Sequence, residues 1–175
     1  IVRSSCYITN VVKERPPDNN IKAFIDVSKP KVRFTPQYSM YEAMLLEELK
    51  DIKANVFVPL GATALYAITR ERSITKWRGS TMPGVNIQGR KTIPTIHPSA
   101  VFQEYIYQWF ILHDLHRVIE ESGSPKIDLP KRALLINQSY ADVMNFLSLI
   151  HNGSDVISFD IEVMNNEISC LSMAT

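Results

Sequence analysis

Short hydrophobic runs alternate along this chain with longer stretches in which apolar residues recur at helical spacing. Residues 6–12 are rich in β-branched side chains, and residues 55–60 repeat the pattern, which is typical of strands buried on both faces. A helix is expected between them, beginning near Ser39, whose hydroxyl suits an N-cap. Its predicted apolar face consists of Tyr41, Leu45, Leu49 and Ile52, with Met44 beside it.

Proline and glycine divide the rest of this first part into loops and helices. Prolines interrupt residues 13–38, which are therefore expected to form a long loop. Gly61 is expected to turn the chain into a short helix over residues 62–68, and residues 85–87 and 91–96 are predicted to pair as a hairpin. A longer helix is predicted over residues 100–121. Its aromatic stripe is expected in the core and consists of Phe102, Tyr105, Trp109 and Phe110.

This alternation of strands and helices predicts the fold class. Strands followed by helices indicate an α/β fold, a three-layer α/β/α arrangement around a mainly parallel sheet. Residues 122–131 are rich in Ser, Gly, Pro and Lys and are predicted to be a linker. The predicted domains are therefore residues 1–121 and the beginning of a second α/β domain over residues 132–175.

The second domain shows its own pattern after the linker. A strand is predicted over residues 132–137 and a helix over residues 140–150. Residues 155–163 form another predicted strand, and a turn at 164–166 leads to a final one. The last two strands are expected to pair as an antiparallel hairpin.

Composition narrows the classes of function. Hydrophobic residues make up 45% of the chain and charged residues 21%, as in ordinary globular domains. The net charge of +1 means that any contact with nucleic acid must come from a local basic patch. Two cysteines cannot supply a four-cysteine metal or cluster site. Because no apolar run reaches the roughly 18 residues of a membrane span and no signal peptide is visible, we expect a cytoplasmic protein without membrane contact. We also expect a monomer.

Two polar residues follow predicted strands and suggest chemistry on a nucleobase. Asn10 lies in the first run, and its carboxamide can pair with both the N3–H donor and the O4 acceptor of uracil, whereas cytosine presents the reverse pattern. His97 precedes Pro98, which restricts it to extended backbone and suits a residue at a strand end. An imidazole donor there would stabilise negative charge on a departing pyrimidine. The alternatives are an Asn that bonds its own backbone and a structural His.

Residues around His97 are candidates for contacts with DNA. Ser99 and neighbouring backbone N–H groups would hold a phosphate at the start of the following helix. A basic stretch with Trp77 in it would follow a DNA backbone and stack on a base. Its cations are Arg70, Arg72, Lys76, Arg78, Arg90 and Lys91. The alternative for this stretch is a solvated loop.

A second candidate site lies in the predicted hairpin. Asp160 and Glu162 stand two residues apart, so both side chains would point to the same face of a strand. Carboxylates at such a position can bind Mg²⁺ or Mn²⁺, and two such ions would support cleavage of a phosphodiester. The alternative is a pair of surface acids.

Taken together, the motifs of residues 1–121 resemble those of the uracil-DNA glycosylase superfamily, most closely its family-4 branch and the related domain of some bacteriophage DNA polymerases. The resemblance rests on residues 7–17, 60–65 and 93–101 in that order. It implies that Asn10 reads uracil and that His97 stabilises the leaving base. It also implies that Val101 occupies the position of the side chain wedged into the DNA stack, usually Leu, and Phe102 is a candidate substitute.

The chain departs from the family pattern at positions that matter for cofactor and activity. Glu14 stands where family-4 enzymes have a cluster cysteine, and a second cluster position falls near Tyr41, so no iron–sulfur cluster is expected. The long loop of residues 13–38 must then be held by packing. The family's Gly-rich first motif, with its water-activating acid, would lie upstream of Ile1, so the chain alone is expected to be catalytically impaired.

The hairpin carries a resemblance of its own. Residues 157–163 and 168–174 resemble the opening of the ribonuclease H-like 3′–5′ exonuclease domain of DNA polymerases. A glycosylase-like domain followed by such an exonuclease implies a fragment of a phage-type DNA polymerase, acting in the host cytoplasm, with Mg²⁺ or Mn²⁺ at the exonuclease site once that site is complete. The open alternatives are a catalytically inactive DNA-binding or docking module and a stand-alone uracil-DNA glycosylase.

Overall fold

The computed structural model describes residues 2–129, 139–153, 158–164 and 167–174. The chain divides into two compact units, unit 1 (Ile1–Leu129) and unit 2 (Pro130–Thr175). This division falls inside the predicted linker, and the predicted strand over residues 132–137 lies outside the described residues.

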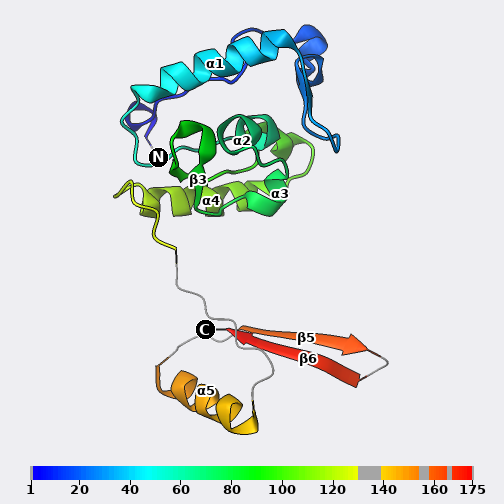
Figure 1. Ribbon diagram of the computed structural model, residues 1–175, viewed down its shortest axis with the longest axis vertical. Helices are drawn as coiled ribbons and strands as arrows, with labels where there is room; N and C mark the ends of the chain where they lie inside the picture. The colour runs from blue at the N-terminus through cyan, green and yellow to red at the C-terminus, as the bar shows by residue number, and fades with distance from the viewer. Residues whose placement is uncertain (1, 130–138, 154–157, 165–166, 175) are drawn as a thin grey trace. The chain divides into compact units, whose positions relative to one another are not determined.

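Unit 1 holds most of the regular structure (Figure 1). Its helices are α1 (Pro36–Lys50), α2 (Gly61–Thr69), α3 (Ile74–Trp77) and α4 (Tyr107–Glu121). Its strands are β1 (Ile25–Asp26), β2 (Arg33–Phe34), β3 (Met82–Gly84) and β4 (Arg90–Thr92). Five 3₁₀ turns complete it: η1 (Arg3–Ser5), η2 (Pro17–Asn19), η3 (Ile21–Ala23), η4 (Val85–Ile87) and η5 (Pro98–Phe102).

Two segments of unit 1 pair in parallel, as the predicted sheet requires. Phe57 bridges Thr92 and Leu60 bridges Thr95, both in parallel orientation. Backbone bonds join the same segments, including Ile93 N–H to the Phe57 carbonyl and Thr95 N–H to the Pro59 carbonyl, at 2.9 and 3.0 Å. Elsewhere in the described residues the sheets are two-stranded and antiparallel. A full three-layer parallel sheet therefore stays a prediction, although α1 and α4 do lie on opposite sides of α2 and β3 (Figure 1).

The first predicted strand is wrong. Residues 6–12 form no strand, and of their side chains only Val12 is fully buried. A strand needs a neighbour to accept its backbone hydrogen bonds, and no pairing of these residues occurs among the described strands and bridges. The predicted burial is wrong as well, since Tyr7 and Ile8 are exposed, and no partner strand for this segment occurs in the described structure.

Helix α1 spans two parts of the core. It begins at Pro36, with Thr35 as its N-cap accepting from the Tyr38 N–H at 3.2 Å, so the cap is Thr35 rather than Ser39. Leu45 and Leu49 enter one hydrophobic cluster. Tyr38 and Tyr41 enter a second cluster with Val12, Phe24 and Ile25. Met44, predicted beside the apolar face, is half exposed.

The hairpin near residue 87 has a different register from the predicted one. β3 pairs with β4, with Met82 opposite Thr92 and Gly84 opposite Arg90. The predicted strand at 85–87 is the 3₁₀ turn η4, whose Ile87 is buried in the first hydrophobic cluster. The turn is therefore held by burial of Ile87, which a period-two pattern does not reveal.

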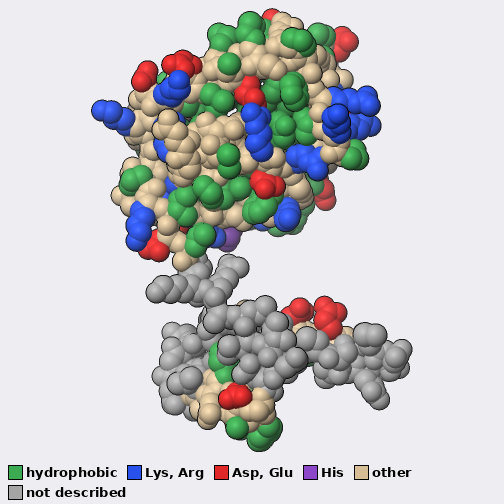
Figure 2. Space-filling view, viewed as in Figure 1, with side chains coloured by type: hydrophobic (Ala, Val, Ile, Leu, Met, Phe, Trp, Pro, Cys, Tyr) green, Lys and Arg blue, Asp and Glu red, His purple; other side chains and the backbone are tan. Residues whose placement is uncertain are grey.

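The aromatic stripe after Pro98 is not core. The predicted helix of residues 100–121 divides into η5 and α4, and α4 begins at Tyr107 without a side-chain cap, so no sequence signal marks its start. Phe102 is 92% exposed and Trp109 59%, whereas Ile111, Asp114 and Val118 form the buried face. Figure 2 shows hydrophobic side chains among the charged ones on the visible face of this unit. Helical spacing identified the helix but not its buried face.

Unit 2 contains α5 (Tyr140–Gly153), β5 (Ser158–Met164) and β6 (Glu167–Ala174). β5 and β6 form the predicted antiparallel hairpin, with Asp160 opposite Ser172 and Glu162 opposite Cys170. The register shifts after Glu162, which marks a bulge. Ile161 and Val163 on the other face of β5 are exposed.

Candidate functional site

His97 stands where the two parallel segments end. Thr95 is fully buried, Ile96 is buried, and the chain reaches the surface at His97. The neighbouring segment ends at Gly61, whose N–H donates to the Thr95 carbonyl at 2.9 Å. Because the carboxyl ends of parallel strands share one edge, Gly61 and His97 meet there. A Cβ on Gly61 would lie 3.1 Å from the His97 Cβ, and the φ of Gly61 is +84°, so two constraints require glycine.

The His97 ring is oriented by the residue two positions later. The Ser99 N–H donates to Nδ1 at 3.2 Å, and the Ser99 hydroxyl lies 2.7 Å from the same nitrogen. A backbone N–H can only donate, so Nδ1 accepts and the neutral ring carries its proton on Nε2. The ring is exposed. His97 therefore presents an Nε2–H donor to whatever binds at this edge. Ser99, predicted as a phosphate contact, is engaged with His97.

The turn after His97 exposes a large aromatic side chain. Val101, the predicted wedge, is half-buried in η5, whereas the next residue, Phe102, is 92% exposed. Of the two candidates for inserting into a base stack, Phe102 is the one that projects from the turn.

A buried carboxylate supports this edge from below. Asp114 is 1% exposed, and its Oδ2 accepts from the Thr95 hydroxyl at 2.7 Å. Arg78 donates to Asp114 from Nε at 3.0 Å and from an Nη at 2.6 Å. A Cβ on Gly79 would lie 2.6 Å from Asp114 Oδ1, so glycine there leaves room for the carboxylate. Sequence reasoning missed Asp114, because a lone acid within a helix carries no motif.

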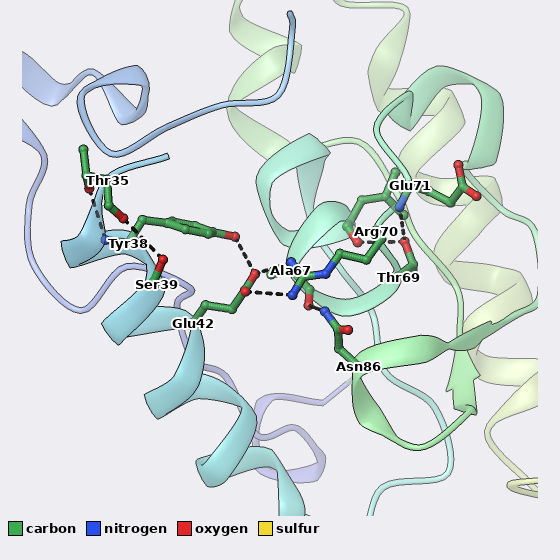
Figure 3. A network of polar contacts seen from close by, with 10 residues as sticks. Thr35, Tyr38, Ser39, Glu42, Ala67, Thr69, Arg70, Glu71 and Asn86 are labelled. Carbon is green, nitrogen blue, oxygen red and sulfur yellow. Dashed lines mark hydrogen bonds and ion pairs between the residues drawn. The ribbon is translucent and has the colours of Figure 1, made fainter. Parts of the chain in front are cut away.

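Arg78 is thus part of the fold. Besides Asp114, its guanidinium contacts the Phe110 carbonyl at 3.0 Å and lies 4.5 Å from the centre of the Phe110 ring. Arg70 of the same basic stretch is also engaged, since it forms a two-pronged ion pair with Glu42 at 2.7 and 2.8 Å (Figure 3). Lys76 differs: it is exposed and lies 5.0 Å from the Trp77 ring centre. Only Lys76 of these three cations remains available to an outside ligand.

The Arg70 pair joins α2 to α1. The Tyr38 hydroxyl donates to Glu42 Oε1 at 2.9 Å, so the carboxylate receives both a phenol and a guanidinium (Figure 3). Burial, followed by the charge of Glu42, raises the pKa of Tyr38 and keeps it a donor. This network fixes α1 beside the helix that starts at Gly61.

Asn10 lies in a segment held by side chains instead of by strand pairing. Its own side chain is exposed. Tyr7 donates to Glu48 Oε1 at 2.5 Å, and Lys13 forms an ion pair with the other oxygen of Glu48. Hydrogen bonds from Lys13 and then Tyr7 lower the pKa of Glu48 to about 2. Among the described residues, no hydrogen bond joins Asn10 to His97. Glu48, which sequence reasoning also missed, anchors the segment that carries Asn10.

Glu14, at the position matching a cluster cysteine, takes part in a hydrogen-bonded group. Gln37 donates to Glu14 Oε1 at 2.7 Å and to the Tyr41 hydroxyl at 3.2 Å. The Tyr41 ring meets the Phe24 ring edge-on, with centroids 6.0 Å apart. Cys6 is a free thiol. The described residues contain no group of three or more His, Cys, Asp or Glu arranged to hold a metal ion.

The two carboxylates of unit 2 lie as predicted along one strand. Asp160 and Glu162 are both exposed, two positions apart on β5. Their side chains therefore share a face of the hairpin. Two carboxylates supply part of a metal-binding set, and the described residues add no third ligand beside them. Within the described part of the chain, no helix is long and apolar enough to cross a membrane.

The chain is similar to two kinds of known protein. Over 122 residues, or 69% of its length, the chain is 29% identical to a DNA polymerase of Bacillus phage SP01. Over 102 residues, or 57% of its length, it is 38% identical to a type-4 uracil-DNA glycosylase of Thermotoga maritima. The matches span 12% and 46% of these relatives. The model of the uracil DNA glycosylase superfamily matches residues 1–116, the part that contains Asn10 and His97. The chain therefore belongs to the uracil DNA glycosylase superfamily.

Proposed function

We propose that unit 1 recognises uracil in DNA and contributes to cleavage of the bond between uracil and deoxyribose. The observation that carries this proposal is the state of His97, whose Nδ1 accepts from Ser99 and whose proton is on Nε2. Family membership supports DNA as the partner.

His97 acts on the leaving base. When the bond between C1′ of the sugar and N1 of uracil breaks, its electron pair departs with the base and negative charge spreads to O2. The Nε2–H of His97 donates a hydrogen bond to O2, and this bond strengthens as the charge develops. The oxygen of a water molecule then bonds to C1′ and releases a proton. Ser99 holds the ring in the tautomer that presents this donor.

Asn10 and Phe102 select and expose the base. The Asn10 carbonyl accepts from N3–H of uracil and its amide donates to O4, a pattern that cytosine does not match. Extrusion of a base costs a few kcal/mol. Phe102, 92% exposed, inserts into the gap and offsets part of that cost.

Replacement of His97 tests the proposal. In the full-length protein, we expect His97→Ala to lower kcat for uracil release by roughly 10²–10³-fold, as the loss of one donor to a developing anion does. His116→Ala is the matched control, since His116 is an exposed histidine on α4. Excision that proceeds equally fast in His97→Ala and wild type would refute the assignment.

A second function, DNA binding without cleavage, is favoured by one observation. Asn10 is exposed and lies outside any strand, so its amide is held less firmly than a rigid reading site requires. Under this alternative, the full-length protein binds uracil-containing and thymine-containing DNA equally well and releases no base. Tighter binding to uracil DNA would reject it.

We further propose that unit 1 keeps its loop in place without an iron–sulfur cluster. The hydrogen bonds of Gln37 with Glu14 and Tyr41, together with the Phe24–Tyr41 contact, support this. The purified protein should contain no stoichiometric iron or sulfide and show no visible absorption. Stoichiometric iron would contradict the proposal.

For the whole protein we propose a phage-type DNA polymerase, monomeric and active in the cytoplasm of a bacterial host. The similarity to the phage polymerase supports this. In unit 2, Asp160 and Glu162 would supply two oxygen ligands for Mg²⁺ or Mn²⁺ in a 3′–5′ exonuclease, and the ion would activate water for phosphodiester cleavage. Removal of 3′-terminal nucleotides by the full-length protein should be abolished in Asp160→Asn. Unchanged removal would refute this role.

A further inference from the structure

A shallow hollow on unit 1 lies between two segments that are far apart in sequence. Its volume is about 510 Å³, and its lining comes from the turn between β1 and β2 and from the connection between α2 and α3. The lining residues are Val27, Ser28, Lys29, Pro30, Arg72 and Ser73. The motifs around Asn10 and His97 include none of these residues, and only Arg72 belongs to the basic stretch of the sequence analysis.

The turn beside this hollow is held in one conformation. Asp26 Oδ1 accepts from the Ser28 N–H at 3.0 Å and from the Ser28 hydroxyl at 2.5 Å. One Nη of Arg72 donates to the carbonyls of Lys29 and Pro30, at 2.8 and 2.6 Å. Pro30 restricts the backbone further. The charged side chains of the turn therefore project from a fixed backbone.

The cations around the hollow form no ion pair among the described residues, although Arg72 donates to two backbone carbonyls of the turn. We call Lys29, Lys31 and Arg72 the hairpin patch; all three are exposed, and no carboxylate in the described residues forms an ion pair with them. Arg70 and Arg78, by contrast, are paired with Glu42 and Asp114.

Two acids near the hairpin patch form no ion pair with it among the described residues. Asp26 accepts from Ser28, and its pKa is lowered first by those hydrogen bonds and less by the charges of Lys22 and Lys29. Glu71 accepts from the Trp77 ring N–H at 3.0 Å. Figure 2 shows Lys and Arg side chains gathered at the right-hand edge of the upper unit, where Figure 1 shows the tip of this hairpin. With a net charge of only +1 on the whole chain, this concentration of cations is local.

We propose that the hairpin patch binds the phosphate backbone of a DNA strand whose base is presented to the His97 edge. This proposal rests on the proposed function only in taking DNA as the ligand. Unpaired cations on a fixed turn fit a polyanion, because they release its counterions on contact without first breaking internal ion pairs. The contact is to phosphate alone, so it adds affinity without reading sequence.

The test compares two double variants that lose the same charge. Lys29→Gln/Lys31→Gln removes two cations from the hairpin patch and keeps the Lys29 backbone carbonyl that Arg72 binds. Lys50→Gln/Lys53→Gln removes two exposed cations at the other end of α1, whose 15 residues span roughly 22 Å. Fluorescence anisotropy measures binding of the 175-residue chain to two fluorescein-labelled single-stranded oligonucleotides at several salt concentrations. One oligonucleotide contains a single uracil, and the other has thymine at that position.

We expect the patch variant to bind both oligonucleotides more weakly, by roughly 5-fold per lost contact at about 0.1 M salt. The slope of log K against log salt should fall by about 0.7 for each lost phosphate contact. The control should keep the wild-type slope. Equal slopes for the patch variant and wild type, or no DNA binding by the wild-type chain, would overturn the proposal. Binding of both proteins to anionic lipid vesicles is measured in parallel. A patch variant that keeps its affinity for DNA but loses binding to the vesicles would also overturn the proposal.

The outcomes also separate this proposal from the proposed function. If the patch variant loses salt-dependent binding and the full-length protein excises no uracil, the patch stands and the glycosylase function fails. If excision is normal and the slopes are equal, the function stands and the patch fails. If the hairpin patch and the glycosylase function are both correct, the full-length protein with the patch substitutions should have a higher KM for uracil DNA and an unchanged kcat.

Discussion

His97 and Asn10, the two residues assigned to the base, lie in segments that the fold holds in different ways. His97 follows a fully buried strand segment that is bonded to its parallel neighbour and to the buried Asp114. Asn10 lies in an exposed segment without strand pairing, tied to α1 by Tyr7 and Lys13 through Glu48. Buried contacts keep their strength in salt, whereas exposed ones are screened. The His97 side should therefore be rigid, and the Asn10 side should respond to pH and salt.

The largest effect should come from Asp114. Asp114→Asn leaves the partly buried Arg78 without its counter-charge and weakens the bond to Thr95, so we expect unfolding free energy to fall by about 3 kcal/mol. Urea unfolding followed by Trp fluorescence measures this, because both tryptophans of the chain, Trp77 and Trp109, lie in unit 1. Asp128→Asn, an exposed site, is the control. A loss as small as that of the control would mean that the buried network does not support the His97 edge.

The second-largest effect on stability is expected at Gly61, whose backbone lies against His97. Gly61→Ala places a methyl group 3.1 Å from the His97 Cβ at a φ of +84°, and we expect a loss of about 2 kcal/mol with slower uracil release. Gly89→Ala is a close control, since its φ is +74° but nothing lies within 4 Å of the added methyl. The difference in unfolding free energy between Gly61→Ala and Gly89→Ala, measured with urea, gives the cost of the contact with His97. Equal losses, with excision unaffected, would show that only backbone strain matters.

The smallest effect should arise at Glu48, on the Asn10 side. Because this carboxylate is a quarter exposed, at 26%, we expect Glu48→Gln to cost less than about 1 kcal/mol of stability. KM for uracil DNA should rise a few-fold, since the segment carrying Asn10 spends less time in its competent position, and kcat should stay unchanged. Glu47→Gln is the control, as Glu47 is the neighbouring residue and pairs only with Lys50 at the surface.

The contribution of Glu48 to the free energy of unfolding should depend on pH. The pKa of Glu48 falls from an ordinary value of 4.5 to about 2 in the folded state. The contribution is therefore fully present above about pH 4.5 and is lost as the pH falls toward 2. The stability difference between wild type and Glu48→Gln should shrink across this range. A difference that stays constant down to pH 2 would contradict the assigned ion pair.

Much of the local structure was predictable from sequence, and the failures share a cause. The helices of residues 36–50, 61–69 and 140–153 and the final hairpin followed from periodicity and turn residues. The strand over residues 6–12 failed because it depends on a partner that the described structure does not supply. The aromatic stripe failed because helical spacing describes an exposed face as well as a buried one. Asp114 and Glu48 were missed because their partners lie 19 to 41 positions away.

The sequence by itself indicated an α/β fold and the family, and it singled out His97 and Asn10 as the residues proposed to act on the base. These inferences depend only on which residue types follow one another along the chain. The tertiary structure decided which cations are neutralised by an ion pair and which keep their charge for a ligand. Arg70 and Arg78 pair with carboxylates, whereas Arg72 binds backbone carbonyls of the turn and pairs with no carboxylate among the described residues. It also decided which nitrogen of His97 carries the proton. Both depend on distances between atoms that only the folded chain brings together.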